Sequence, residues 1–325
     1  MYRFLNLSME KLRKIQTWWD IYTCLHENGR AHIGEVCKKM KYTGRGKNRD
    51  TISRYLNEAF EKGIITRPRL TLANHEGSTL YAYLLKCTEK RTELFEILRK
   101  HPEVLYIVLL NGDYQLFFTS RSNQVLLPCP HEVSPIFTPI YTMPGGWNRS
   151  EQQCLNAVTS HIYEEGTLSR SVFDPLDWDP LDWQIYNVFR MDLRQNLKKV
   201  AENLRVSYET IRLHLYGKIL PQTIQFLGFF PRGLQNYSHI FFLVKTPYER
   251  SFISALSKLQ TSCTIWPLQS HLICMVYFQH LNLFLDTLFN LEKRKIFKEY
   301  YFLLPVEFDE SRPSRERGTP GQNHL

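Results

Sequence analysis

Near the start of this 325-residue sequence, residues 38–54 hold seven lysines and arginines against a single acid, Asp50. Cationic side chains at this density neutralise phosphates and release counterions, which gives salt-dependent binding to nucleic acid. The alternative is a solvated basic loop. The run leads directly into an amphipathic segment that starts near Thr51, and this position favours the nucleic-acid interpretation.

Two short helices are predicted to present polar side chains to a partner. In residues 206–217, Ser207 is a good N-cap, Ile211 and Leu215 share one face, and Gly217 is expected to end the helix. A short helix with one buried apolar face and one exposed polar face is typical of a helix-turn-helix recognition element. The expected DNA contacts are Lys47, Asn48, Arg49, Thr51, Ser53, Arg54 and the wing residue Arg67 in the first region, and Tyr208, Thr210, Arg212 and His214 in the second.

The two recognition-type segments belong to a longer repeat. The six residues from Thr51 resemble the six from Thr210, an offset of 159 residues, and the same offset relates Lys86 to Lys245. Upstream, similar tetrapeptides begin at Trp19 and Trp183, an offset of 164. A nearly constant offset over this length indicates that one unit of roughly domain size occurs twice.

Each copy passes from a helical period to an alternating, strand-like period. The second part reads as strand, helix, strand, strand, connection and strand, which is the ferredoxin-like βαββαβ plan. The predicted fold class is α+β, with two winged helix-turn-helix domains alternating with two ferredoxin-like domains. The predicted boundaries are 1–74 and 75–144 for the first pair, 145–180 for a linker with a short helix, 181–235 and 236–308 for the second pair, and 309–325 for a disordered tail.

Composition restricts the class of protein. A hydrophobic content of 43% supports real cores, and a formal charge of +9 suits an acidic partner. The seven cysteines are scattered without CxxC spacing, and no apolar run is long enough for a membrane span. We therefore expect a cytoplasmic protein with no metal site, no cofactor, no catalytic residues and no membrane association.

Gly112, Asp113, Tyr114 and Gln115 form a turn between two predicted strands. Together with the order of elements, this turn resembles the Lrp/AsnC family of bacterial and archaeal regulators. In that family a Gly-Asp-Tyr-Asp turn lies where sheet domains meet and small molecules bind, so the resemblance implies an effector site at these four residues and at His271 of the second copy. It also implies an internal pseudo-dimer. The alternative is that these four residues form a tight hairpin without a role in ligand binding.

The predicted function is sequence-specific DNA-binding transcriptional regulation, without enzymatic activity. Double-stranded DNA is the expected partner; a small-molecule effector and further homo-oligomerisation are left open. One alternative is an enzyme, because the siroheme decarboxylases resemble this family and use the same domain pair; here His239, His271, His280 and Arg250 could pair with the carboxylates of a porphyrin. A second alternative is a sensor or interaction protein that does not bind DNA.

Overall fold

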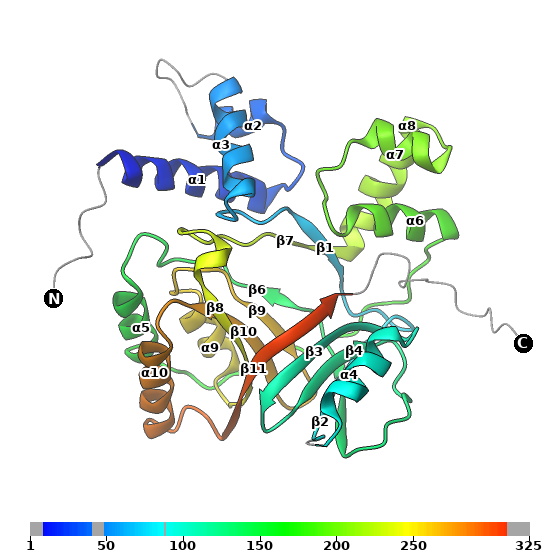
Figure 1. Cartoon of the computed structure of the whole chain (residues 1–325). Helices are drawn as coiled ribbons and strands as arrows, with labels where there is room; N and C mark the ends of the chain where they lie inside the picture. Colours follow the sequence, from blue (N-terminus) through cyan, green and yellow to red (C-terminus); the bar gives the residue numbers. More distant parts are fainter. Residues whose placement is uncertain (1–8, 41–48, 88, 311–325) are drawn as a thin grey trace, which may run out of the picture.

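The computed structural model describes residues 9–40, 49–87 and 89–310 of the chain. In this part the protein is a mixed α+β structure with ten α-helices and a curled antiparallel sheet (Figure 1). Two helical units lie on the same side of the sheet. None of the described helices combines the length and the apolar character needed to cross a bilayer.

The first helical unit contains α1 (Met9–Glu27), α2 (Ile33–Lys39) and α3 (Arg49–Glu61), followed by β1 (Arg69–Leu72). Ile21 and Leu25 are four residues apart on α1 and are both fully buried, which is the pattern of a helix with one apolar face. Beyond the end of α3, Gly63 adopts a φ of +61°, a left-handed conformation that favours glycine after a helix.

The second helical unit contains α6 (Pro180–Phe189), α7 (Leu197–Leu204) and α8 (Tyr208–His214), followed by β7 (Thr223–Phe226). Asp179 caps α6 by accepting from the amides of Leu181 and Asp182, and Pro180 occupies the first turn, where no amide donor is needed. Ser207 caps α8 as predicted, by accepting from the amide of Thr210. The expected end at Gly217 is wrong, because α8 continues into a π-helical turn, Leu215–Ile219, and Gly217 has no positive φ.

Two arginines at equivalent places join the helical units. Arg30 donates from Nη1 to the backbone oxygens of Leu193 and Gln195. Arg194 donates from Nη1 to the oxygens of Gly29 and Ala31, at 2.9 and 3.0 Å. Each arginine therefore binds the carbonyl groups that flank the other, and the contact is reciprocal.

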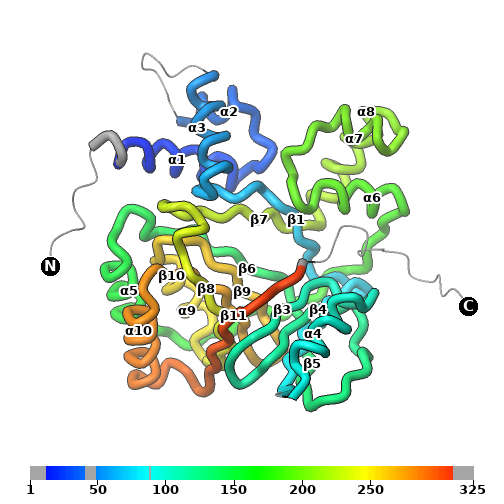
Figure 2. The backbone as a smooth tube through the Cα atoms, in the orientation of Figure 1, coloured from blue at the N-terminus to red at the C-terminus, as the bar shows by residue number. Residues whose placement is uncertain are grey.

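The predicted wing strands do not fold back on their own helices. β1 and β7 pair with each other, antiparallel, from Arg69 opposite Phe226 to Leu72 opposite Thr223. Figure 2 shows this two-stranded ribbon between the helical units and the large sheet. One strand from each helical unit therefore forms a single shared ribbon.

The large sheet contains two groups of four strands. The first group is β2 (Leu80–Leu85), β3 (Val104–Gly112), β4 (Leu116–Ser120) and β5 (His131–Ile136), with α4 (Arg91–Lys100) between β2 and β3. The second group is β8 (Ser238–Lys245), β9 (Thr264–Pro267), β10 (Leu272–Phe278) and β11 (Glu299–Glu310), with α9 (Glu249–Leu256) and α10 (Leu281–Lys293). The spatial orders are β5-β2-β4-β3 and β11-β8-β10-β9, so each group has the order fourth, first, third, second.

The last strand of the second group also pairs with the first group, and a short strand that follows the first group pairs with the second. β11 pairs with β8 through Glu299–Leu303 and then with β3 through residues 303–310. Just after β5, the short strand β6 (Ile140–Tyr141) pairs with β9 at the far end of the sheet. The sheet therefore curls until its two ends are joined by one short stretch of chain.

The cores follow from this curvature. The inner face holds buried residues from both strand groups, including Val108, Phe117, Phe241 and Ile273. On the outside, α4 covers the first group, while α9, α10 and the linker helix α5 (Glu151–Thr159) cover the second. No helix lies between β4 and β5 in the described chain, so the first group lacks the second helix that the ferredoxin-like pattern predicts.

Candidate functional site

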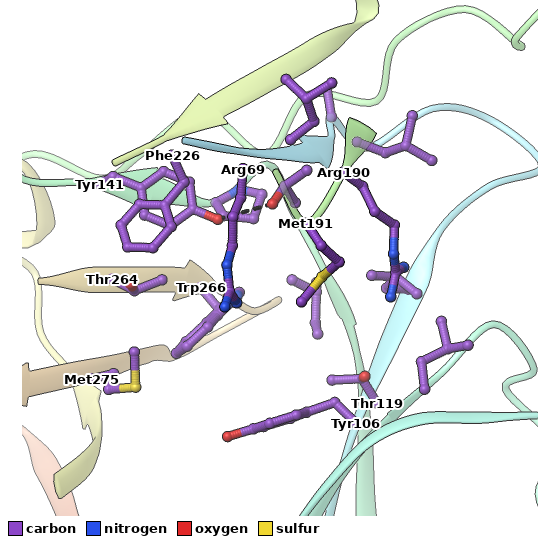
Figure 3. Close-up of a pocket in the computed structure, with 18 of the residues that line it drawn as sticks. Arg69, Tyr106, Thr119, Tyr141, Arg190, Met191, Phe226, Thr264, Trp266 and Met275 are labelled. Carbon is purple, nitrogen blue, oxygen red and sulfur yellow. Dashed lines mark hydrogen bonds between the residues drawn. The ribbon is translucent and has the colours of Figure 1, made fainter. Parts of the chain in front are cut away.

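A cavity of about 600 Å³ lies between the β1–β7 ribbon and the inner face of the curled sheet (Figure 3). β1 and β7 form its roof through residues such as Leu70 and Phe226. Tyr106 and Thr119 line it from β3 and β4, and Trp266 from β9. Its volume is within the range of about 300–1,000 Å³ that is usual for ligand-binding cavities.

The charged groups of the cavity all have one sign. Arg69, Arg121 and Arg190 line it, and no aspartate, glutamate or lysine does so among the described residues. Arg69 and Arg190 reach downward from the helical side, with Met191 between them (Figure 3). Arg121 lies over the ring of Trp183 at 5.5 Å and donates to the oxygen of Ser78 at 3.4 Å. Guanidinium groups in a weakly solvated cavity attract anions and bind carboxylates through paired hydrogen bonds.

Aromatic rings form much of the remaining wall. Tyr141 and Phe226 are stacked with centroids 4.2 Å apart, and the Tyr141 hydroxyl lies 3.1 Å from Thr71 Oγ1. Trp266 stacks on Phe241 at 6.0 Å. A ligand that fits this composition combines a flat apolar body with several anionic groups.

His239, on β8, is the imidazole of the cavity. Its ring lies 5.5 Å from that of Tyr277, and its nitrogens form no hydrogen bond within the described chain. Burial lowers the pKa of His239, because desolvation disfavours the charged ring. Burial also raises the pKa of Tyr277 and of Tyr237, so both phenols keep their protons. At neutral pH the cavity therefore holds a neutral imidazole close to neutral phenols.

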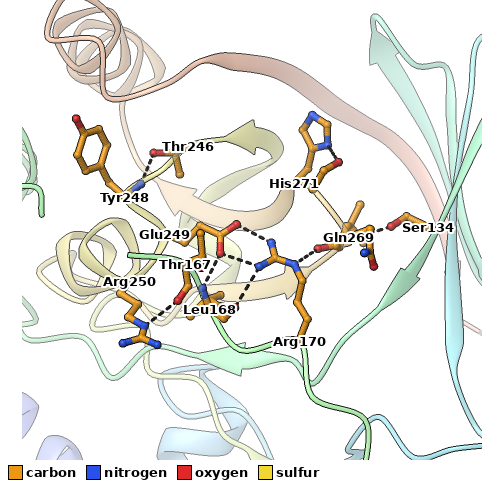
Figure 4. A network of polar contacts seen from close by, with 12 residues as sticks. Ser134, Thr167, Leu168, Arg170, Thr246, Tyr248, Glu249, Arg250, Gln269 and His271 are labelled. Carbon is orange, nitrogen blue, oxygen red and sulfur yellow. Dashed lines mark hydrogen bonds and ion pairs between the residues drawn. The ribbon is translucent and has the colours of Figure 1, made fainter. Parts of the chain in front are cut away.

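Residues 160–179 connect α5 to α6 without a helix, and we call them the strap. Arg170 donates to both carboxylate oxygens of Glu249, at 2.6 and 3.0 Å, and from Nε to the oxygen of Leu268 at 2.6 Å (Figure 4). The amide of Leu168 also donates to Glu249, at 2.7 Å. Glu249 is buried, so these bonds compensate a charge that would otherwise be costly. They hold the strap against α9.

The strap continues from Arg170 to the rim of the cavity. The Phe173 amide donates to the oxygen of Asn74 at 2.8 Å, and the Glu76 amide donates to the oxygen of Phe173 at 3.0 Å. His75 Nδ1 lies 2.8 Å from the oxygen of Asp174. Asn74 lines the cavity, so the strap supports one part of its wall.

The predicted DNA-contacting residues of the first unit do not form a basic surface. Lys47 and Asn48 lie outside the described residues. Arg49, Thr51, Ser53 and Arg54 lie on α3, but Arg67 pairs with Asp192 at 2.9 Å. A groove of about 620 Å³ along α3 is lined by Asp50, Ser53, Arg54, Asn57, Glu58 and Glu61. Arg54 is the basic residue of this groove, and Glu58 pairs with Lys14 and Lys62, at 2.6 Å each.

In the second unit, most of the predicted DNA-contacting side chains interact with other groups of the protein. His214 Nδ1 lies 2.6 Å from the buried carboxylate of Asp182, which also pairs with Lys218 at 3.2 Å. Arg212 pairs with Glu209 at 3.4 Å. The Thr210 hydroxyl is 2.8 Å from that of Ser207, while Tyr208 remains exposed. Asp179, Asp182 and His214 place possible metal ligands within 4.8 Å of one another, but the helix cap and Lys218 already use these oxygens.

The turn of Gly112, Asp113, Tyr114 and Gln115 lies where β3 meets β11. Gly112 has a φ of +143°, and a side chain there would collide with the backbone oxygen of Phe302. The Tyr114 hydroxyl donates to Glu132 at 2.6 Å, and Gln115 accepts from the Cys87 amide at 2.8 Å. His271 lies 3.7 Å from Glu299, whose other oxygen accepts from Tyr301, and the ring of Tyr301 contacts that of Tyr114. The structure brings the turn and His271 together at one edge of the sheet, through Glu299 and Tyr301. Effector binding at this edge remains a prediction.

Of the four residues considered for porphyrin binding, one lines the cavity. His239 does so, whereas His271 lies at the edge just described. His280 pairs with Glu151 at 2.6 Å, and Arg250 donates to the oxygen of Thr167 at 2.8 Å. Neither His280 nor Arg250 lines the cavity.

No protein-family model matches this sequence, and no curated protein matches it either. Among solved structures, the chain is similar to one described as the siroheme decarboxylase NirDL, with a TM-score of 0.54 and 9% sequence identity over 92% of both chains. The chain folds like that enzyme. A second structure, described as NirDL in co-complex with an iron-uroporphyrin III analogue, aligns over 93% of both chains with a TM-score of 0.49 and 10% identity.

This likeness corrects the interpretation drawn from the sequence. The fold is similar to that of a siroheme decarboxylase, and the identification as a transcriptional regulator is wrong. The expectations of a DNA partner and of no enzymatic activity are wrong with it. The physical reason is visible in both helical units: carboxylates accompany the basic groups on α3, and internal ion pairs occupy those of α8.

The sequence did not reveal the cavity arginines as a set. These arginines are Arg69, Arg121 and Arg190. They come from a strand, a loop after β4 and the end of α6, so no local motif unites them. Pairing of β1 with β7 brings these distant segments together.

Proposed function

We propose that this chain is a siroheme-decarboxylase-like enzyme, which binds an iron tetrapyrrole with several carboxylates and removes carboxyl groups from it. The observation that carries the proposal is the cavity, in which Arg69, Arg121 and Arg190 face a common space that no described acid lines. Its aromatic wall suits the flat macrocycle. The similarity to the fold of a siroheme decarboxylase supports the same assignment.

The arginines would bind carboxylates that stay on the substrate, and so fix the orientation of the macrocycle. Arg69 and Arg190 reach down from the helical side. Arg121 lines the same cavity from the loop after β4, so cations from three segments would hold the ligand. In this proposal the helical units are the cover of the substrate cavity. The two helical units, whose order of elements resembles a DNA-binding domain, would serve to close the cavity.

The reaction requires one proton for each carboxyl group lost. The bond between the side-chain carbon and the carboxylate breaks, carbon dioxide leaves, and the electron pair stays on the carbon and is delocalised into the macrocycle. A proton then adds to that carbon. His239 is the proposed donor. Burial lowers its pKa, and an anionic substrate beside it would raise that pKa, so the ring would be protonated when substrate is bound.

We also propose that the chain is a tandem duplication, with winged helix-turn-helix domains at 1–74 and 181–235 and ferredoxin-like domains at 75–144 and 236–308. The shared strand order of the two groups supports this division. So does the reciprocal contact of Arg30 and Arg194, which are 164 residues apart, the same offset that relates Trp19 to Trp183. The two ferredoxin-like domains would then form an internal pseudo-dimer around the cavity.

The function is tested by anaerobic incubation of the purified protein with siroheme, followed by mass spectrometry of the extracted tetrapyrrole. We expect products that have lost carbon dioxide. His239→Gln should slow their formation on the order of 10²-fold, the usual contribution of a positioned acid, while the tetrapyrrole still binds. His280→Gln, outside the cavity, is the matched control and should act as the wild type does. Absence of both binding and product with the wild-type protein would refute the proposal.

A further inference from the structure

Two half-buried cysteines, Cys87 and Cys129, lie just beyond the paired ends of β2 and β5. The last register pair of these strands is Leu85 opposite His131. One step farther, the amide of Lys86 donates to the oxygen of Pro130 at 3.0 Å. The same antiparallel register then places Cys87 opposite Cys129, and both pack against the core under α4.

The position is suitable for a covalent bond between the two sulfurs. Because the backbone hydrogen bond joins Lys86 to Pro130, the cysteines occupy the neighbouring non-hydrogen-bonded pair, where Cα atoms are about 4.5 Å apart. Disulfides span Cα separations of about 4.4–6.8 Å. Cys87 Sγ donates to the oxygen of Glu89 at 3.1 Å, so its side chain is held at this end of the sheet.

We propose that Cys87 and Cys129 are a redox-active pair, which a low-molecular-weight disulfide converts to an intramolecular disulfide. The remaining cysteines differ in setting. Cys24, Cys154, Cys263 and Cys274 are buried, and Cys37 is half-buried on α2, in a different unit from the pair. The proposal is independent of the reaction assigned to the cavity.

The oxidation of the two cysteines proceeds by two successive thiol–disulfide exchanges. The Cys87 thiolate attacks one sulfur of the small disulfide, so a mixed disulfide forms and one small thiolate leaves. Cys129 then gives up its proton and attacks Cys87 Sγ, which forms the internal bond and releases the second small thiolate. Two protein thiols are oxidised and one small disulfide is reduced to two thiols. Burial, reinforced by the neighbouring Cys87, raises the pKa of Cys129 to about 11, which suits its role as the second, resolving thiol.

The bond would fix the strand through which the sheet closes. β5 pairs with β2 at one end of the sheet, and the chain then passes directly to β6, which pairs with β9 at the other end. Between them, Ile136 and Phe137 line the cavity. Oxidation would therefore hold β5 against β2 at the end remote from the cavity and stabilise the closed sheet.

The test equilibrates the full-length protein with mixtures of reduced and oxidised glutathione, traps free thiols by rapid alkylation and maps the peptides by mass spectrometry. We expect Cys87 and Cys129 to lose their thiols together, in a cross-linked peptide pair. Cys129→Ser should accumulate glutathione on Cys87, because the resolving thiol is absent. Cys37→Ser should leave the cross-link unchanged, and the cross-linked protein should melt at a higher temperature than the reduced one.

Two results would overturn the proposal. One is glutathione on Cys87 and Cys129 separately in the wild-type protein, without an internal cross-link. The other is both thiols remaining reduced under conditions in which Cys37 is already modified. Cys87→Ala serves as a second variant: it should abolish the cross-link and leave the melting temperature insensitive to the glutathione ratio.

Discussion

The two helical units follow the same plan and contact each other, yet their recognition-type helices use their polar groups differently. α3 has thirteen residues, and Asp50, Glu58 and Glu61 line the groove on its surface. α8 has seven residues, and its His214 turns inward to the fully buried carboxylate of Asp182. α3 therefore has acids beside its arginines, whereas α8 uses His214 to contact a buried acid of α6.

On the side that faces the sheet the units are alike. Arg69, from the strand after the first unit, and Arg190, from the end of α6 in the second, both reach the cavity. The comparison teaches that the helix-turn-helix plan does not by itself predict a DNA surface. Here the arginines of the cavity come from three segments, namely Arg69 from β1, Arg190 from the end of α6 and Arg121 from the loop after β4.

The largest expected difference between the units concerns their buried and exposed acids. Asp182→Ala removes a fully buried carboxylate that serves His214, Lys218 and the α6 cap, and should lower the free energy of unfolding by about 3–5 kcal/mol. Glu58→Ala removes a more exposed carboxylate that pairs with Lys14 and should cost less than about 1 kcal/mol. Urea unfolding of both variants measures the difference. Equal losses would mean that the second unit is not anchored through Asp182.

The reciprocal arginines should show a smaller and coupled effect. Arg194→Ala and Arg30→Ala each remove charge-assisted hydrogen bonds to backbone carbonyls and should each cost about 1.5–3 kcal/mol. Because both act on one interface, the double variant should cost clearly less than the sum of the two. Chemical unfolding of the three variants gives the coupling energy. Simple additivity would show that the two contacts act independently.

The smallest effect is the contribution of His26, in the first unit, to the pH dependence of stability. Burial lowers the pKa of His26, whereas the residue 164 positions later is Arg190, which does not titrate in this range. The folded state therefore binds fewer protons than the unfolded state just below the ordinary histidine pKa of about 6.5. The free energy of unfolding should be highest above that pH and fall as the pH is lowered through it.

His26→Gln should flatten this fall, as measured by urea unfolding at several pH values. A residual slope is expected from His161 and His239, because burial lowers the pKa of each. A profile identical to that of the wild type would show that His26 does not contribute to the pH dependence.

Local features of the fold could be predicted from the sequence, because neighbouring residues determine them. The cap at Ser207 is confirmed. The pairing of β1 with β7 could not be predicted, since an alternating pattern does not reveal which distant strand is its partner. The cavity depends on that pairing, so the sequence indicates a single residue of its lining, His239, as a candidate for ligand binding.

The most direct test of the central claim is an anaerobic absorption titration with two iron porphyrins, one carrying free carboxylates and the other their methyl esters. We predict saturable binding of the acid, much weaker binding of the ester, and a loss of about tenfold or more in affinity for the acid in Arg69→Gln, Arg121→Gln and Arg190→Gln. Arg99→Gln, which removes an arginine on α4 outside the cavity, should bind as the wild type does. Equal affinity for acid and ester, or no binding of either, would contradict the account.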